Sequence, residues 1–250
     1  MRRAAIPLVL IVCLAGPTAS SRAETAKEVI QKAVDAMGGA ETIKKYPAAR
    51  ATNKGKISVM GLEIELEGEA AYMLPDKAKT TMKMEVLGQK VNVVQIVNGE
   101  KTKITANDMA TPISDAQKQE LKLSMALQAV QNLAPLLEDK TYELSLIENP
   151  EKVKDKEVVG VAVKAKDIKE VKLFFDKKTN LIAKIERMGL DPAEKEVKQE
   201  MYFLAHKKFD GIMRPVKMEI LMDGKKFMEG EVTDYKHLDK IDKKEFDVSD

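Results

Sequence analysis

The sequence has 250 residues, 33% of them Asp, Glu, Lys or Arg, and its formal net charge is +2. Three of its arginines lie before residue 24, so the remaining chain is close to neutral and lacks the basic surplus typical of nucleic-acid binding. The single cysteine, Cys13, lies in the same leading segment, so the rest of the chain must be stabilised by a buried core rather than by disulfides.

The leading segment has the pattern of an export signal. Arg2 and Arg3 precede an apolar stretch over residues 4–15, which is too short to span a bilayer because a membrane helix needs about 20 residues. Ser21 and Ala23 supply the small residues that a signal peptidase requires before its cleavage point. We therefore predict a signal peptide over residues 1–23, cleavage after Ala23, a periplasmic location, and a single domain over residues 24–250.

A helix is predicted directly after the signal. Thr25 and Glu28 have the spacing of a capping box, in which each side chain accepts a hydrogen bond from the other residue's backbone N–H. Gly38 and Gly39 offer a left-handed end to this helix, and a short second helical turn is predicted over residues 40–45. The apolar residues that recur at helical spacing are Val29, Ile30, Ala33, Val34 and Met37.

Alternation with a period of two replaces the helical spacing from Ala51 onward, which predicts long antiparallel strands. The dipeptide Asn98-Gly99 is a strong hairpin signal because both residues tolerate positive φ. Leu62, Ile64 and Leu66 alternate with the solvated Glu63, Glu65, Glu67 and Glu69, and Met82, Met84 and Val86 alternate with Lys83 and Glu85.

A second long helix is predicted over residues 114–137. Ser114 and Gln117 form its capping box, and Pro135 is expected to kink or end it because proline cannot continue the backbone hydrogen bonds. The second half of this segment is apolar around most of its circumference, so it must be covered on more than one side. We expect it to lie across the mouth or the concave face of a curved sheet.

Strands resume after Asp139, and no repeat or linker divides the chain. The pattern predicts ten or eleven long strands and an α+β, mainly β fold. This fold is a single strongly curved antiparallel sheet, an unclosed β-barrel, with helices covering its concave face. The strands predicted in this second part span residues 142–147, 157–164, 169–176, 181–188, 197–205, 214–222 and 226–236.

Two stretches resemble the periplasmic outer-membrane lipoprotein-carrier superfamily. The first is residues 36–41, Ala-Met-Gly-Gly-Ala-Glu, which lead into the first strand. The second is the closing run, with a strand entered through Pro215, a hairpin at Asp223-Gly224 and a terminal Phe246. The resemblance implies an unclosed barrel with a helical lid and a role as a lipoprotein carrier. It leaves the family's functional arginine open among Arg50, Arg187 and Arg214.

An apolar cavity inside the curved sheet is the predicted binding site. The sequence has 14 methionines, and this flexible, polarisable side chain suits a surface that accepts variable apolar shapes. The alternative is that the same side chains simply fill the interior. The predicted lining is Leu62, Ile64, Leu66, Met82, Met84, Val86, Val171, Leu173, Phe175, Met201, Phe203, Met218, Ile220 and Met222, with Leu133 and Leu136 on the lid.

No pattern indicates catalysis. The two histidines, His206 and His237, lie among charged residues near strand ends and are interpreted as surface residues. No histidine pair or HExxH spacing indicates a metal site, and no nucleophile, phosphate-loop or dinucleotide motif occurs. We predict no catalytic residues, no metal, no cofactor and no enzymatic activity.

The resulting functional prediction is a periplasmic carrier or binding protein that holds a lipid acyl chain or the lipid moiety of a lipoprotein. The alternative is a non-catalytic envelope scaffold or protein-binding module with a filled core. The predicted partners are a lipid or a lipidated protein, and an envelope protein in the alternative case. Nucleic acid is not expected, and the chain is expected to be a monomer.

Overall fold

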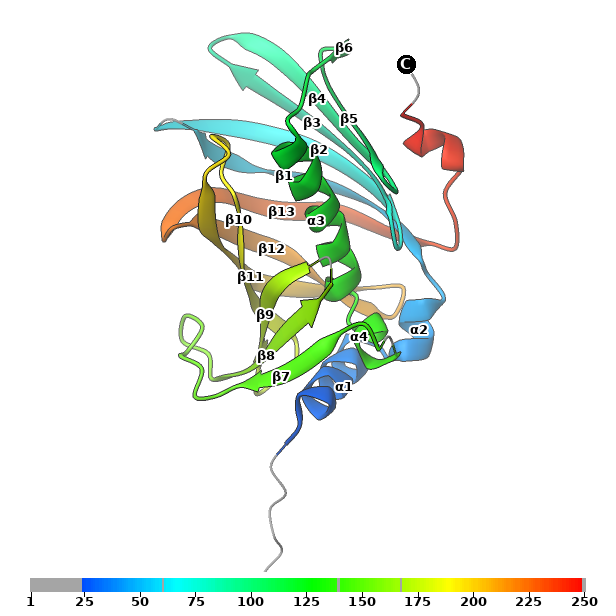
Figure 1. Ribbon diagram of the computed structural model, residues 1–250, viewed down its shortest axis with the longest axis vertical. Coiled ribbons are helices and arrows are strands. Elements are labelled where there is room, and N and C mark those ends of the chain that lie inside the picture. The colour runs from blue at the N-terminus through cyan, green and yellow to red at the C-terminus, as the bar shows by residue number, and fades with distance from the viewer. Residues whose placement is uncertain (1–23, 60, 139, 167, 249–250) are drawn as a thin grey trace, which may run out of the picture.

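The computed structural model describes residues 24–248 except 60, 139 and 167 (Figure 1). The predicted signal peptide lies outside these residues. Thirteen described strands form one antiparallel sheet in the order β6-β5-β4-β3-β2-β1-β13-β12-β11-β10-β9-β8-β7. The predicted fold class is therefore confirmed. The predicted number of ten or eleven strands is too low, in part because a two-residue strand such as β6 carries no readable alternation.

The elements follow one another along the chain in two runs of strands separated by helices. The first run contains α1 (Ala26–Met37), α2 (Ala40–Lys44), β1 (Ala48–Val59), β2 (Leu62–Met73), β3 (Lys77–Val86), β4 (Gln89–Asn98), β5 (Lys101–Ala106) and β6 (Met109–Ala110). The helices α3 (Asp115–Gln131) and α4 (Ala134–Glu138) follow. The second run contains β7 (Glu143–Ile147), β8 (Val158–Ala165), β9 (Ile168–Asp176), β10 (Ile182–Leu190), β11 (Glu196–Phe209), β12 (Ile212–Met222), β13 (Lys225–Leu238) and the 3-10 helix η1 (Lys243–Phe246).

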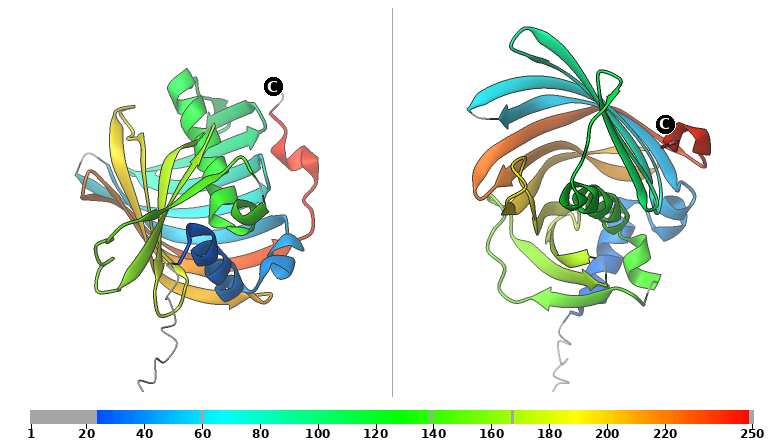
Figure 2. Two further views of the ribbon diagram at one scale, coloured as in Figure 1. Left: turned by 60° about the horizontal axis from the view of Figure 1, so that its bottom comes forward. Right: turned by 45° about the horizontal axis from the view of Figure 1, so that its top comes forward.

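The sheet is built outward from its centre. β1 lies between β2 and β13, and the chain meanders from β1 to the edge strand β6. The helices α3 and α4 then carry it to the opposite edge, β7, from which it meanders back to β13. Figure 2 shows that the sheet bends strongly around α3 while its two edges stay apart. The helical connection thus crosses the concave side, as predicted.

The first helix docks on the turn between β11 and β12. The predicted capping box is present, with Thr25 Oγ1 accepting from Glu28 N at 3.2 Å and Glu28 Oε2 accepting from Thr25 N at 2.7 Å. Gly38 has a φ of +128°, and a Cβ atom there would lie 2.5 Å from the Gly211 carbonyl oxygen. Glycine is therefore required where this helix ends. The contact brings together the two stretches that carried the family resemblance.

The predicted helix over residues 114–137 is in fact two helices. The capping box of Ser114 and Gln117 starts α3 as expected, but α3 ends at Gln131 and Leu133 adopts a φ of +58°. Pro135 lies in the first turn of α4, where its missing N–H has no helical role. The interruption expected near this proline is present, but the single continuous helix is wrong, because the left-handed backbone at Leu133 ends α3 before the proline while Ala134 and Pro135 already belong to α4.

The main core fills one half of the concave side. It packs α1, α2, α4 and the end of α3 against β8–β12, with Ile30, Leu133, Leu173 and Ile212 fully buried. Two smaller clusters lie elsewhere. One includes Val153 and Phe174, and the other forms where Phe246 of η1 packs beside the start of β1.

Candidate functional site

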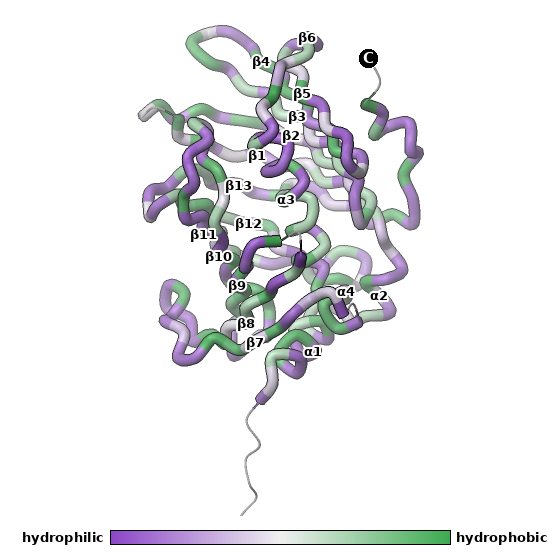
Figure 3. Tube along the Cα trace, in the orientation of Figure 1, coloured by the Kyte–Doolittle hydropathy of each residue, from purple (hydrophilic) through white to green (hydrophobic). Residues whose placement is uncertain are grey.

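The two faces of the sheet differ in chemistry. On β2, Glu65 pairs with Lys56 and Glu67 pairs with Lys54 across the strands, while Leu66 lies opposite Gly55 on the other face. Because side chains alternate along a strand, the register extends these two faces across the sheet. Figure 3 shows the alternation of hydrophilic and hydrophobic positions along the strands. The apolar face is the concave one, which α3 crosses.

The predicted lining residues on the strands share this concave face. Leu173 pairs with Ile185, which pairs with Met201, which pairs with Ile220. In the other half of the sheet, Leu66 pairs with Met84 on the same concave face. The register thus brings together residues from β2, β3, β9, β11 and β12 that lie far apart in the sequence.

Burial divides these residues into two groups. Val171, Leu173 and Phe175 are at most 1% exposed and pack beneath the helices, together with Leu133 and Leu136. Leu66 and Phe203 are also buried. The half-buried members are Ile64, Met82, Met84, Val86, Met201, Met218, Ile220 and Met222, and Leu62 is 51% exposed.

Further apolar residues that the sequence analysis missed lie on the same face. Four of them are half-buried and pair with predicted residues of β2, β3 and β12, namely Ile57, Val91, Val93 and Met228. Ile104 is also half-buried and pairs with Gln95 of β4 on the same face. Val91 and Val93 belong to an almost continuous apolar run, so no alternation marks their face. We call the half-buried concave residues Ile57, Ile64, Met82, Met84, Val91, Val93, Ile220 and Met228 the open face. None of these eight belongs to a buried cluster of the described chain.

The helix α3 bridges the concave side from wall to wall (Figure 2). Glu120 of α3 forms an ion pair with Arg187 of β10, and Lys122 forms one with Glu100 in the turn between β4 and β5. At its start, Ser114 Oγ donates to Glu194 Oε2 at 2.9 Å. Polar contacts therefore attach the helix to both halves of the curved sheet, at β10 and at the turn between β4 and β5.

An interior cavity of about 210 Å³ lies beneath the last turns of α3. Predicted residues form part of its apolar wall, namely Met201, Phe203 and Met218. Its polar wall contains side chains that the sequence analysis did not assign to a site: Tyr72, Gln128, Gln131, Asn132, Arg214, Tyr235 and His237. The proline that follows Arg214 marks the strand entry, but nothing in the sequence indicates that this arginine faces inward.

Arg214 is held in this cavity by neutral groups. Its Nε donates to His237 Nε2 at 3.2 Å, and its Nη2 donates to Asn132 Oδ1 at 3.1 Å. The guanidinium lies 5.9 Å from the centre of the Tyr235 ring, whose hydroxyl is hydrogen-bonded to that of Tyr72. Burial lowers the pKa of Arg214, although an arginine side chain keeps its proton in proteins.

The interpretation of both histidines as surface residues is wrong. His237 is 5% exposed because the rings of Tyr46 and Tyr235 cover it, and His206 is half-buried. Burial, and then the charge of Arg214, lower the pKa of His237 despite the Asp210 carboxylate at 3.4 Å. A neutral imidazole agrees with Nε2 accepting the hydrogen bond from Arg214.

A larger depression of about 1120 Å³ involves β1–β4 and β11–β13. Its lining is dominated by lysine and glutamate side chains such as Lys54, Glu67, Lys83 and Glu231, which the register places on the charged face. It is therefore not the predicted apolar cavity, although it is much the larger of the two. The smaller cavity lies beneath the bridging helix and is the better candidate for an enclosed site.

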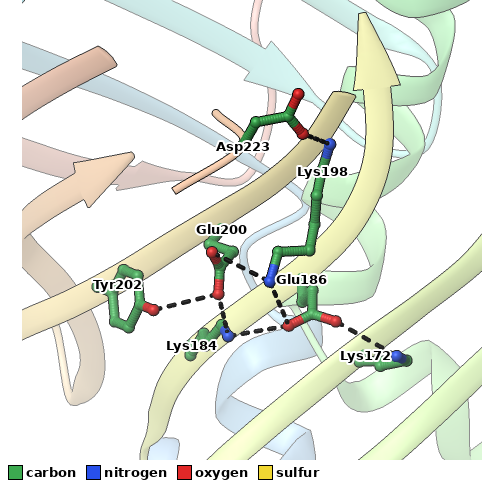
Figure 4. A network of polar contacts seen from close by, with 7 residues as sticks. All are labelled: Lys172, Lys184, Glu186, Lys198, Glu200, Tyr202 and Asp223. Carbon is green, nitrogen blue, oxygen red and sulfur yellow. Dashed lines mark hydrogen bonds and ion pairs between the residues drawn. The ribbon is translucent and has the colours of Figure 1, made fainter. Parts of the chain in front are cut away.

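The charged face also carries a compact ion network (Figure 4). Lys184 lies between Glu186, at 2.9 Å, and Glu200, and it is only 9% exposed. Lys172 also pairs with Glu186 and Lys198 with Glu200, and Tyr202 donates to Glu200 at 3.2 Å. Each charge has an opposite partner, so the network is a stabilising feature of β9–β11 rather than a reactive site.

Within residues 24–248, leaving out the three undescribed positions, no helix has both the length and the apolar character needed to cross a membrane. The same residues contain no cluster of three or more His, Cys, Asp or Glu side chains that could hold a metal ion.

Known proteins resemble this chain in structure and not detectably in sequence. No family model and no curated protein matches the sequence. A DUF1329 family protein from Desulfovibrio piger superposes with a TM-score of 0.56 at 14% identity, covering 90% of this chain and 98% of its own. A LolA superfamily protein from Nitrosomonas europaea gives 0.56 at 13% identity, covering 88% and 97%.

A third structure extends the comparison. The putative outer membrane lipoprotein-sorting protein domain from Vibrio parahaemolyticus has a TM-score of 0.53 at 11% identity, covering 88% of this chain and 95% of its own. The three matches cover almost the whole described sheet and its helices, and at such low identity they establish the fold alone. The predicted resemblance is thereby confirmed at that level: this chain shares the fold of LolA superfamily and lipoprotein-sorting proteins.

Proposed function

We propose that this protein is a periplasmic carrier or binding protein that holds a lipid acyl chain, alone or as part of a lipoprotein, on its open face beneath α3. The observation that carries the proposal is the open face itself. Its eight apolar residues are half-buried, and no buried cluster of the described chain includes them. Contiguous exposed apolar surface on a soluble domain commonly marks an interaction site.

The chemistry of the open face fits an acyl chain. Met82, Met84 and Met228 have flexible, polarisable side chains that adapt to irregular apolar shapes. Burying an acyl chain contributes about 0.8 kcal/mol per methylene. A long chain therefore contributes on the order of 10 kcal/mol before the entropic costs of binding are subtracted.

The helix α3 is proposed as the lid of this site. Its contacts with the sheet include exposed ion pairs such as Lys122 with Glu100, which contribute little stability each. Separation of these contacts would let the first half of α3 move away from the concave side, while Leu127 and Val130 at its end stay in the main core. The role of α3 as a lid and the periplasmic location both depend on the proposed carrier function. The names of the proteins that share this fold support that function.

A protein-binding scaffold is the second candidate. The core residues Val171, Leu173 and Phe175 support it, because half of the concave side is filled by the protein's own helices. In this case the open face would be covered by a polypeptide partner rather than by a lipid.

The test is binding of the apolar fluorophore N-phenyl-1-naphthylamine to the purified chain from residue 24 onward, compared between matched variants. M84E places a carboxylate on the open face, and we expect at least about tenfold weaker binding because that charge would be desolvated. E85Q alters the next residue, on the opposite face of the same strand, and should leave binding unchanged. Equal affinity of M84E and the unmodified protein, with both folded, would contradict the proposal. A lack of binding by the unmodified protein would favour the scaffold.

A further inference from the structure

We propose that the interior cavity beneath α3 binds the anionic head group of an acyl-chain ligand, a carboxylate or a phosphate, through Arg214. This inference rests on the proposed function and specifies the ligand class of the same concave side. It concerns the polar end of the ligand, whereas the open face concerns its chain.

The three arginines of residues 24–248 differ in their partners. Arg50 pairs with Glu245, and Arg187 pairs with Glu120. Arg214 lines the interior cavity, yet no carboxylate of the described residues forms an ion pair with it. A buried charge without an opposite charge is costly, so such groups are normally paired or bind a charged ligand.

Arg214 keeps N–H donors that no described residue accepts from. A guanidinium has five N–H groups, and Arg214 uses one each toward His237 and Asn132 among the described residues. The bond from Nε to His237 fixes the plane of the guanidinium, and the centre of the Tyr235 ring lies 5.9 Å from it. The fork of donors that suits a carboxylate or a phosphate is therefore oriented in advance.

The interior cavity borders the open face at Met218. This residue lines the cavity and pairs with Gly230, which has no side chain to separate the cavity from the neighbouring concave surface. Ile220 is the next residue of β12 on the same side and pairs with Met228 of the open face. A chain attached to a head group at Arg214 would thus reach the open face past Met218.

The size of the cavity supports binding of the head group inside it and of most of the acyl chain outside it. Its volume of about 210 Å³ exceeds the 150 Å³ or so of an engineered cavity that binds benzene. It can hold a small head group and the first few carbons, and the remainder of a long acyl chain must then lie along the concave face. The apolar wall formed by Met201, Phe203 and Met218 lies where that chain would start.

The experiment compares three ligands with the same sixteen-carbon chain on the delipidated protein: palmitate, hexadecyl phosphate and hexadecanol. Each is titrated against bound N-phenyl-1-naphthylamine at a pH at which both acids are ionised. We expect at least one acid to bind about tenfold or more tightly than hexadecanol, since charged hydrogen bonds contribute that much or more. Which acid is preferred distinguishes a fatty acid from a phospholipid-type head group.

R214Q should abolish the preference for the acid while leaving the affinity for hexadecanol unchanged, and R214K should retain part of it because the charge remains. R50Q is the matched control, since Arg50 lies outside the cavity, and it should keep the full preference. Equal binding of all three ligands by the unmodified protein would overturn the inference, as would an unchanged preference in folded R214Q. If none of the ligands binds, the proposed carrier function itself fails, which is a different result.

Discussion

The two halves of the concave side have the same alternating strand pattern but differ in burial: the half around β9 is filled, and the half around β3 is open. On β9, Val171, Leu173 and Phe175 are at most 1% exposed, because α1 and α4 cover them. On β3, Met82 and Met84 occupy the equivalent face and stay half-buried, because only α3 crosses that side and it does not fill it. Alternation decides which face is apolar, but the helices decide whether that face becomes core or binding surface.

The largest expected effect is a loss of stability, which should differ between the filled half and the open half. F175A removes a fully buried ring from the filled half and should lower the free energy of unfolding by about 3–5 kcal/mol. M84A removes a half-buried side chain from the open face and should cost about 1 kcal/mol or less, since little surrounding structure collapses. Urea denaturation measures both. Equal losses would mean that the open face is as well packed as the core.

The ion network on the outer side of the filled half should show the next largest effect. K184M leaves Glu186 and Glu200 without their central cation, and we expect a loss of about 2 kcal/mol because these groups are largely buried. K56M on the charged side of the open half removes an exposed lysine 3.9 Å from Glu63 and Glu65 and should have no measurable effect. If K56M lowers the free energy of unfolding as much as K184M does, the different exposure of the two lysines does not determine how much their ion pairs contribute.

The same network predicts a dependence on pH. Burial alone raises the pKa of Glu200, but the hydrogen bond and charge of Lys184, with those of Lys198, outweigh it and lower the pKa on balance; the pKa of Glu186 is lowered for a similar reason. A carboxyl group with a lowered pKa in the folded state stabilises that state above its unfolded pKa, and this contribution is lost as the pH falls through the lowered value.

Unfolding of the unmodified protein should therefore become easier as the pH is lowered below the ordinary glutamate range. The slope should be shallower in K184M, in which the cation that lowers both pKa values is absent. Denaturation series at several acidic pH values give both slopes. Parallel curves for the two proteins would show that Lys184 does not control these carboxyl groups.

The smallest expected effect concerns the pair between Arg50 and Glu245, which connects β1 to η1. The arginine side chain is half-exposed, so R50Q should change the free energy of unfolding by about 1 kcal/mol at most. F246A in the same region removes a fully buried side chain and should cost several times more. Thermal or urea unfolding compares them, and a reversed order would mean that the ion pair rather than the ring holds η1 in place.

Local signals in the sequence predicted most of the fold. Capping boxes at Thr25 and Ser114 and the hairpin at Asn98-Gly99 are decided within a few residues, and the structure has all three. The break at Leu133 was expected only as a kink near Pro135, since the turn that separates α3 from α4 depends on how both helices pack.

The candidate site was predictable in part. Alternation placed Met84 and Ile220 on one face correctly, but the sequence does not say which strands the helices cover, because that depends on contacts between distant elements. The inward position of Arg214 and the burial of His237 had no sequence signal for the same reason. His237 follows the exposed Lys236, and Arg214 lies between Met213 and Pro215, so no local pattern marks either side chain as facing inward.

The most direct test of the central claim is native mass spectrometry of the chain purified gently from the periplasm, with lipid extraction of the same sample. We predict a stoichiometric acylated adduct on the unmodified protein that is diminished in M84E, while E85Q retains it. A protein that carries no adduct, and that also fails to bind an apolar fluorophore after purification, would contradict a lipid site on the open face.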